Sequence, residues 1–182
     1  MKRAILTATT VLVAWAAATA HAEPQLTVLL AGGSEANTIS IWVSPDGRSY
    51  VIDSVVPLEV GGNVCAHPDG KETELICGAS SIGGFEVNAG GGDDSVAVAR
   101  EIPIPVTLRG GPGQDRLVGG SGGDKFVGGT GDDTLVGRGG ADSLFGGLGN
   151  DRMFGGSGND LLNGDGGDDM ALGGTGRNEI VD

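Results

Sequence analysis

Seven aspartates recur at intervals of nine residues in the second half of the chain: Asp115, Asp124, Asp133, Asp142, Asp151, Asp160 and Asp169. Each aspartate closes a glycine-rich stretch, and an apolar residue follows two positions later, as in GGTGDDTLV from Gly128 to Val136. Carboxylates and backbone carbonyls supply the oxygen ligands that hard cations such as Ca²⁺ prefer. The pattern therefore predicts a series of cation sites, held by a structure with the same period.

The aspartates belong to eight consecutive nonamers without an insertion, from residue 110 to 181: GGPGQDRLV, GGSGGDKFV, GGTGDDTLV, GRGGADSLF, GGLGNDRMF, GGSGNDLLN, GDGGDDMAL and GGTGRNEIV. Positions one and four are glycine in all eight nonamers, and position six is aspartate except at Asn178. Position eight is apolar throughout: Leu117, Phe126, Leu135, Leu144, Met153, Leu162, Ala171 and Ile180. Low-complexity drift would not keep these columns in register, so the segment is an ordered repeat array.

The column chemistry predicts the local structure of one nonamer. Glycine adopts a positive φ without a Cβ clash, so the first six residues can form a tight turn with carbonyl oxygens pointing inward. The last three positions can extend as a short strand, whose middle side chain faces the interior. Two nonamers then form one coil of 18 residues. Stacked coils give two parallel sheets with strands ~4.8 Å apart.

Stacking sorts the position-six residues into two columns, one on each side of the roll. Without a cation, each column places like charges about one strand spacing apart, which is destabilising. A divalent ion between successive turns would attract the carboxylates on both sides and so replace their repulsion with a net attraction. Four turns leave three gaps in each column, so there is room for six ions. The two columns are Asp115, Asp133, Asp151 and Asp169 on one side, and Asp124, Asp142, Asp160 and Asn178 on the other.

The nonamers resemble the RTX, or haemolysin-type calcium-binding, repeat GGxGxDxUx, where U is a large apolar residue. The resemblance implies an all-β fold, a right-handed parallel β-roll (β-solenoid) of nonapeptide repeats, with Ca²⁺ between adjacent turns. It implies that the seven aspartates are the side-chain ligands. Carbonyls of the turn glycines are implied to complete the shell: Gly111, Gly113, Gly120, Gly122, Gly129, Gly131, Gly147, Gly149, Gly156 and Gly158.

Some repeats depart from this pattern. Arg138 replaces the second glycine of the fourth repeat and places a positive charge near a gap. Asp165 replaces the equivalent glycine of the seventh repeat, but aspartate tolerates positive φ and adds an oxygen. Arg177 and Asn178 weaken the last turn. We expect the site at Asn178 to be the weakest or empty, and four or five sites to be well occupied.

Residues 23–109 differ from the roll predicted at 110–182, with fewer glycines and more β-branched residues. Residues 90–96 (GGGDDSV) resemble one degenerate repeat, and residues 32–39 a more distant one. This pattern predicts an irregular, β-rich N-terminal cap that continues the solenoid; a separate small β-domain is the alternative. Position nine is also mostly apolar, so this segment or a partner is expected to cover one outer face. Strands are predicted at 26–33, 37–44, 49–56, 74–78, 85–89 and 104–108.

Residues 1–22 have the features of a cleaved signal peptide: a basic start, an apolar run and a small-x-small end. A membrane anchor is the alternative, but the run is short for a span. Cleavage changes the net charge from −13 to −15, which disfavours nucleic acid and anionic membranes and favours cations. In an exported chain, Cys65 and Cys77 are expected to form a disulfide across a hairpin; a metal-binding or catalytic thiol is the alternative.

The sequence contains no HExxH or GxSxG pattern, and His67 is expected to be a polar turn residue, so we predict no enzyme. We predict a secreted, extracellular calcium-binding protein that folds on binding Ca²⁺ and has a structural or adhesive role. Two alternatives stay open. One is a module that binds an extracellular protein or glycan only with calcium, and the other is an enzyme with an unrecognised site in 23–109.

Overall fold

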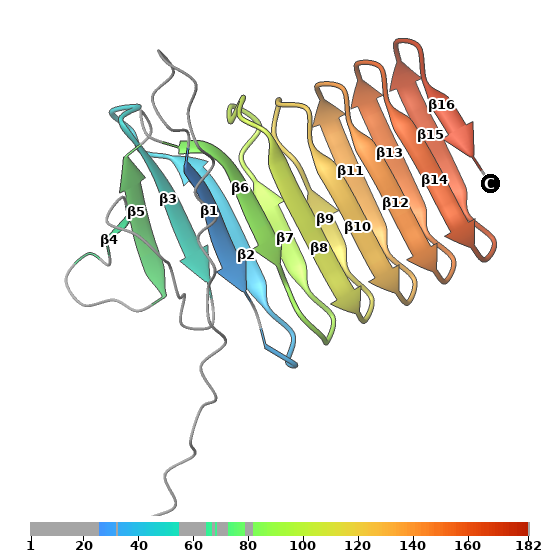
Figure 1. Ribbon diagram of the computed structural model, residues 1–182, viewed down its shortest axis with the longest axis horizontal. Helices are drawn as coiled ribbons and strands as arrows, with labels where there is room; N and C mark the ends of the chain where they lie inside the picture. The colour runs from blue at the N-terminus through green and yellow to red at the C-terminus, as the bar shows by residue number, and fades with distance from the viewer. Residues whose placement is uncertain are drawn as a thin grey trace, which may run out of the picture.

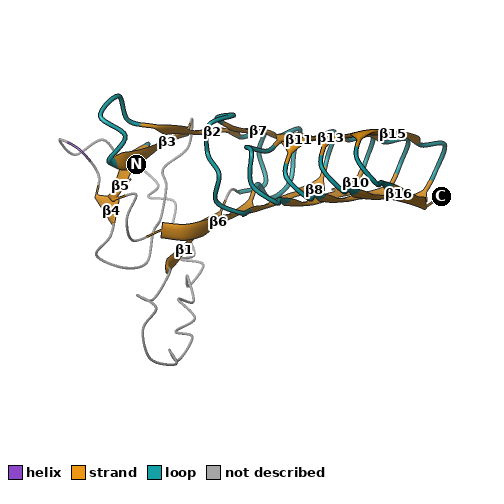
Figure 2. Cartoon of the chain, turned by 90° about the horizontal axis from the view of Figure 1, so that it is seen from above, coloured by secondary structure: helices purple, strands orange, loops and turns teal. Residues whose placement is uncertain are grey.

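The structure, a computed structural model, describes residues 26–31, 33–54, 65–66, 68, 73–78 and 82–181. The predicted signal peptide and His67 lie outside the described residues. The elements of the described residues are strands in two sheets, which run side by side along one axis (Figure 1). Seen from above, the sheets form two layers that loops connect at both edges (Figure 2). None of the described residues forms a helix of the length and apolar character that crossing a bilayer requires.

Within the repeats, consecutive strands alternate between the two sheets, and all neighbours in a sheet are parallel. Leu135 lies between Leu117 and Met153 in the ladder, which confirms the coil of 18 residues. The chain therefore forms the predicted all-β parallel β-roll. Its strands are β8 (Val106–Pro112), β9 (Arg116–Val118), β10 (Lys125–Thr130), β11 (Thr134–Gly139), β12 (Ser143–Leu148), β13 (Arg152–Ser157), β14 (Leu161–Gly166), β15 (Met170–Thr175) and β16 (Glu179–Val181).

The strands are longer than the sequence pattern predicts. We expected three extended residues per nonamer, whereas β10 to β15 have six residues each. The glycines at positions one and two stay in the strand, and Gly129 at position two lies opposite both Gly111 and Gly147. Pairing with the coils on both sides satisfies the backbone of these glycines and shortens the turn to positions four to six.

The strands of the N-terminal region lie in the same two sheets. Each of the six predicted strands overlaps an observed one, with bounds that differ by a few residues, and residues 32, 55 and 56 of the predicted ranges lie outside the described residues. In one sheet β6 pairs parallel with β8, and β1 pairs parallel with β6. In the other sheet β7 pairs parallel with β9, and β2 pairs parallel with β7. Beyond β2, the strands β3, β5 and β4 pair antiparallel and end that sheet irregularly. The bounds are β1 (Leu26–Ala31), β2 (Thr38–Val43), β3 (Ser49–Ser54), β4 (Cys65–Ala66), β5 (Glu74–Gly78), β6 (Ile82–Asn88) and β7 (Ser95–Val98).

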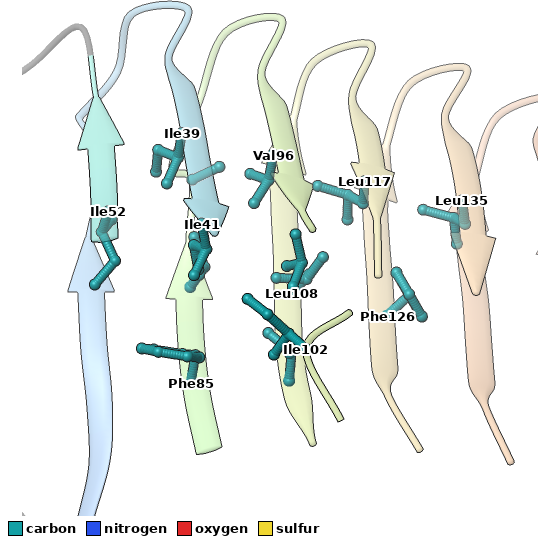
Figure 3. Packing of buried hydrophobic residues seen from close by; sticks show 14 of the residues in the cluster. Ile39, Ile41, Ile52, Phe85, Val96, Ile102, Leu108, Leu117, Phe126 and Leu135 are labelled. Atoms are coloured by element: carbon teal, nitrogen blue, oxygen red, sulfur yellow. The ribbon is translucent and has the colours of Figure 1, made fainter. Parts of the chain in front are cut away.

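One apolar core runs between the sheets. The position-eight side chains from Leu117 to Leu162 are fully buried, as predicted, while Ile180 at the open C-terminal end is 49% exposed. Figure 3 shows the core continuing into the N-terminal strands, with Ile39, Val96 and Leu117 in successive strands of one sheet. This continuous core holds the turns on both edges in register.

Candidate metal centre

The position-six residues form two ladders, one on each edge of the roll. In the first, the N–H of Asp115 donates to Oδ1 of Asp133 at 2.7 Å, and the N–H of Asp133 donates to Oδ1 of Asp151 at 2.8 Å. The remaining links of both ladders repeat this contact. The two predicted columns are therefore present: Asp115, Asp133, Asp151 and Asp169, and Asp124, Asp142, Asp160 and Asn178.

The second carboxylate oxygen has no such partner in most of these residues. Five of the seven aspartates are at most 2% exposed, and their Oδ2 atoms have no hydrogen-bond partner among the described residues. Burying a carboxylate without a compensating partner is costly, so these oxygens need a positive charge. The five are Asp115, Asp133, Asp142, Asp151 and Asp160.

Backbone carbonyls line the gaps between the turns. The carbonyl oxygens of Gly111 and Gly113 lie against Gly129 and Gly131 of the next coil, where any Cβ would clash with them. The same close approach recurs along both columns, so these glycines are needed for contact between coils as well as for positive φ. The predicted glycines with this geometry are Gly111, Gly113, Gly129, Gly131, Gly147, Gly149, Gly156 and Gly158; Gly140 and Gly167 share it at position four.

This donor set fits a hard divalent cation. Where the chain is described, no group of three or more His, Cys, Asp or Glu side chains could hold a metal by itself. An ion between two turns would instead combine one or two carboxylates with backbone carbonyls, the mixed oxygen shell that Ca²⁺ accepts. The position-six aspartates and the carbonyls of positions two and four would hold it, and its charge would compensate the buried carboxylates.

The turn of the second repeat departs from the others. Gly120 and Gly122 lack the positive φ of their equivalents, and they lie against the carbonyls of residues 102–104. Asp124 accepts hydrogen bonds on both oxygens, from the N–H groups of Val106 at 2.9 Å and Gly120 at 2.8 Å. On this edge of the roll, the turn before the second repeat is not a nonamer turn. The irregular segment that includes residues 102–104 occupies that position.

Arg138 lies in the same column. It adopts a positive φ of 76°, and its guanidinium donates to the carbonyls of Val98 at 2.7 Å and Gly119 at 3.0 Å. A fixed positive charge therefore covers the N-terminal end of the column that contains Asp124. Asp165 also adopts a positive φ, of 68°, but its side chain is exposed and accepts a hydrogen bond from Asn163.

The first ladder has two further members, Asp94 and Asn37, that lie outside the predicted columns. The N–H of Asp94 donates to Asp115 at 2.8 Å, and Oδ1 of Asp94 accepts from the N–H of Asn37 at 2.6 Å. The GGGDD stretch gave the signal for Asp94, but its separation from Asp115 is 21 residues, so it falls outside the nonamer register. Asn37 lies 57 residues from Asp94, and the distant resemblance of residues 32–39 to a repeat places it at position six.

The ladders predict a pH dependence of calcium binding. In the ion-free roll, burial raises the pKa of Asp133 and Asp142 to about 7, and the pKa of Asp115 and Asp124 to about 6. Because these folded-state values lie above the unfolded value of 3.8, the stability of the ion-free roll falls as pH rises through this window. Calcium competes with the same protons, so its affinity rises over that window.

Calcium titrations with a competing chelator at about pH 5 and about pH 8 measure this effect. We expect at least about tenfold tighter binding at the higher pH, since each site includes a carboxylate that must lose its proton. An affinity that does not change with pH would contradict burial of the ligand carboxylates.

Comparison with known proteins gives one result. A family model described as the RTX calcium-binding nonapeptide repeat matches four times, at residues 106–126, 118–153, 127–162 and 145–180. No curated protein and no solved structure matches the chain. The matches span the strands and turns that form the two ladders.

Proposed function

We propose, since residues 106–180 belong to the family of RTX calcium-binding nonapeptide repeats, that this is an extracellular calcium-binding protein whose roll folds around the ions. The observation that carries the proposal is the set of five buried aspartates whose second oxygens have no partner among the described residues. Bound Ca²⁺ would neutralise the two columns and thereby remove the main obstacle to stacking the coils. The protein would have a structural or adhesive role, and we assign no catalytic step to it.

External calcium would fill these sites and internal calcium would not. Sites in extracellular modules have dissociation constants of ~0.1–1 mM, which millimolar calcium outside the cell exceeds or matches. The chain would therefore stay unfolded before export and gain its structure afterwards. Because binding and folding are linked, the roll would fold only where external calcium is available.

Isothermal titration of the purified protein with Ca²⁺ tests the calcium assignment. We expect several ions per chain, with weaker binding of Mg²⁺, because the carbonyl-rich gaps suit the larger and more flexible shell of Ca²⁺. No heat of binding and no measurable affinity for Ca²⁺ would overturn the proposed function.

The proposal extends to the ends of the molecule. Residues 1–22 would act as a cleaved signal peptide, 23–109 as the irregular cap and 110–182 as the roll. Cys65 lies directly opposite Cys77 on neighbouring antiparallel strands, which supports the predicted disulfide. The mass of the protein recovered from culture medium, before and after reduction, tests cleavage and cross-linking together. A mass that retains residues 1–22 or that does not change on reduction would contradict the respective assignment.

A calcium-dependent partner is the second candidate function. At position nine, Val127, Val136, Phe145 and Phe154 are only half-buried in the roll, and Leu172 is 54% exposed. A folded roll would present these apolar side chains on the outer surfaces of its two sheets, Val127 and Phe145 on one and Val136, Phe154 and Leu172 on the other, whereas an unfolded chain would not. Capture of the partner in Ca²⁺ but not in EDTA would favour this role over a purely structural one.

A further inference from the structure

The turn before the recognised repeats has the conformation of a calcium-binding turn. Gly90 and Gly92 have φ values of 107° and 101°, at the two places where Gly111 and Gly113 of the first repeat have 115° and 145°. Asp94 follows Gly92 at the spacing by which Asp115 follows Gly113. Residues 89–94 thus repeat the backbone of a nonamer turn, although the family match begins only at residue 106.

The gap between this turn and the first repeat has the same ligands as the gaps inside the roll. The carbonyl oxygens of Gly90 and Gly92 lie against Gly111 and Gly113, in the close approach that the repeats show. Asp94 is 2% exposed, and its Oδ2 has no hydrogen-bond partner among the described residues. The gap therefore combines backbone carbonyls with a buried carboxylate oxygen that lacks a partner.

On its other side, Asp94 meets hydrogen-bond donors in place of a cation. The side-chain amide of Asn37 donates to the carbonyl of Ala89 at 2.8 Å and to Oδ1 of Asp94 at 3.0 Å, and the backbone N–H of Asn37 donates to the same Oδ1. Three N–H contacts thus satisfy the oxygens that face the N-terminal end of the column. The amide of Asn37 carries no net charge, and its Oδ1 is buried without a hydrogen-bond partner among the described residues, so the column of carboxylates ends here.

We propose a further divalent-cation site, of the Ca²⁺ type, between the turn of residues 89–94 and the turn of residues 110–115. Asp94 supplies its N-terminal carboxylate, with Gly90 and Gly92 as carbonyl donors, and Asn37 ends the column beyond it. The inference rests on the proposed function and adds one site to those within the recognised repeats. It also joins the N-terminal region to the roll through an ion, so that calcium orders the junction as well as the repeats.

Counting bound ions by native mass spectrometry at saturating Ca²⁺ tests the site. Asp94→Asn is expected to bind one Ca²⁺ fewer than the unmodified protein. Asp93→Asn is the matched control, because it removes the same charge from an exposed neighbour that accepts a hydrogen bond from the N–H of Gln114. Its ion count should not change. An Asp94→Asn protein that binds as many ions as the unmodified chain would overturn the site.

A second variant decides the matter if Asp94→Asn fails to give the β-sheet circular dichroism spectrum. Asp94→Ser also removes the carboxylate, and at saturating Ca²⁺ it should bind one ion fewer than the unmodified protein. An unchanged count in Asp94→Ser would then refute the site. An unmodified protein that binds no Ca²⁺ at all would instead refute the proposed function, so the two failures are distinguishable.

Discussion

Chelation of calcium is expected to abolish the β-sheet signal of the roll in far-UV circular dichroism, and added Ca²⁺ should restore it. The position-six carboxylates stack at each 18-residue step along both edges, and most are buried with an oxygen that lacks a partner. For free calcium at ten times the dissociation constant, binding contributes about 1.4 kcal/mol per site, so five sites give about 7 kcal/mol. That is comparable with the whole stability of a small domain.

Two controls separate this prediction from a general effect of salt. Mg²⁺ at the same ionic strength should restore far less signal, because it requires a small octahedral shell and gives up its waters reluctantly. Lowering the pH toward about 4 without calcium should restore part of the signal, because protonation removes the charge from the ladders. A full β-sheet spectrum in EDTA at neutral pH would show that the columns do not need neutralisation.

The periodic part of the molecule could be predicted from sequence because each column has one physical role. The spacing of Asp133 and Leu135 within a nonamer defines both the edge ladder and the core, and the period of nine sets the coil. The sequence pattern did not show that the glycines are also needed for contact between coils. Their close contact with carbonyls of the preceding coil depends on the stacking distance between coils, which no single nonamer encodes.

The irregular part could be predicted only as strands. Asn37 and Asp94 are brought together by the parallel pairing of β2 with β7, across 57 residues of chain. Likewise, Arg138 donates hydrogen bonds to the carbonyls of Val98 and Gly119 because the strand order places β7, β9 and β11 side by side. Such contacts follow from the order of strands in the sheets, whereas the local pattern shows only a replaced glycine or a degenerate repeat.

The largest mutational effect is expected at a position-four glycine, for which Gly131→Ala is the test. Gly131 has a φ of 119°, and a Cβ at this residue would clash with the carbonyl of Gly113 in the preceding coil. Alanine would therefore combine backbone strain with separation of two coils at a calcium gap. We expect the free energy of unfolding to fall by more than about 3 kcal/mol at saturating calcium, measured by urea denaturation.

Gly139→Ala is the matched control, since it adds the same methyl group at position three of the next repeat. Gly139 lacks a positive φ, and the nearest atom to its added Cβ would be the mobile Oγ of Ser157 at 3.3 Å. Other repeats already hold proline, serine, threonine or leucine at this position. The expected loss is below about 1 kcal/mol. Equal losses in both variants would mean that neither the positive φ of Gly131 nor its close contact with the preceding coil determines the stability of the roll.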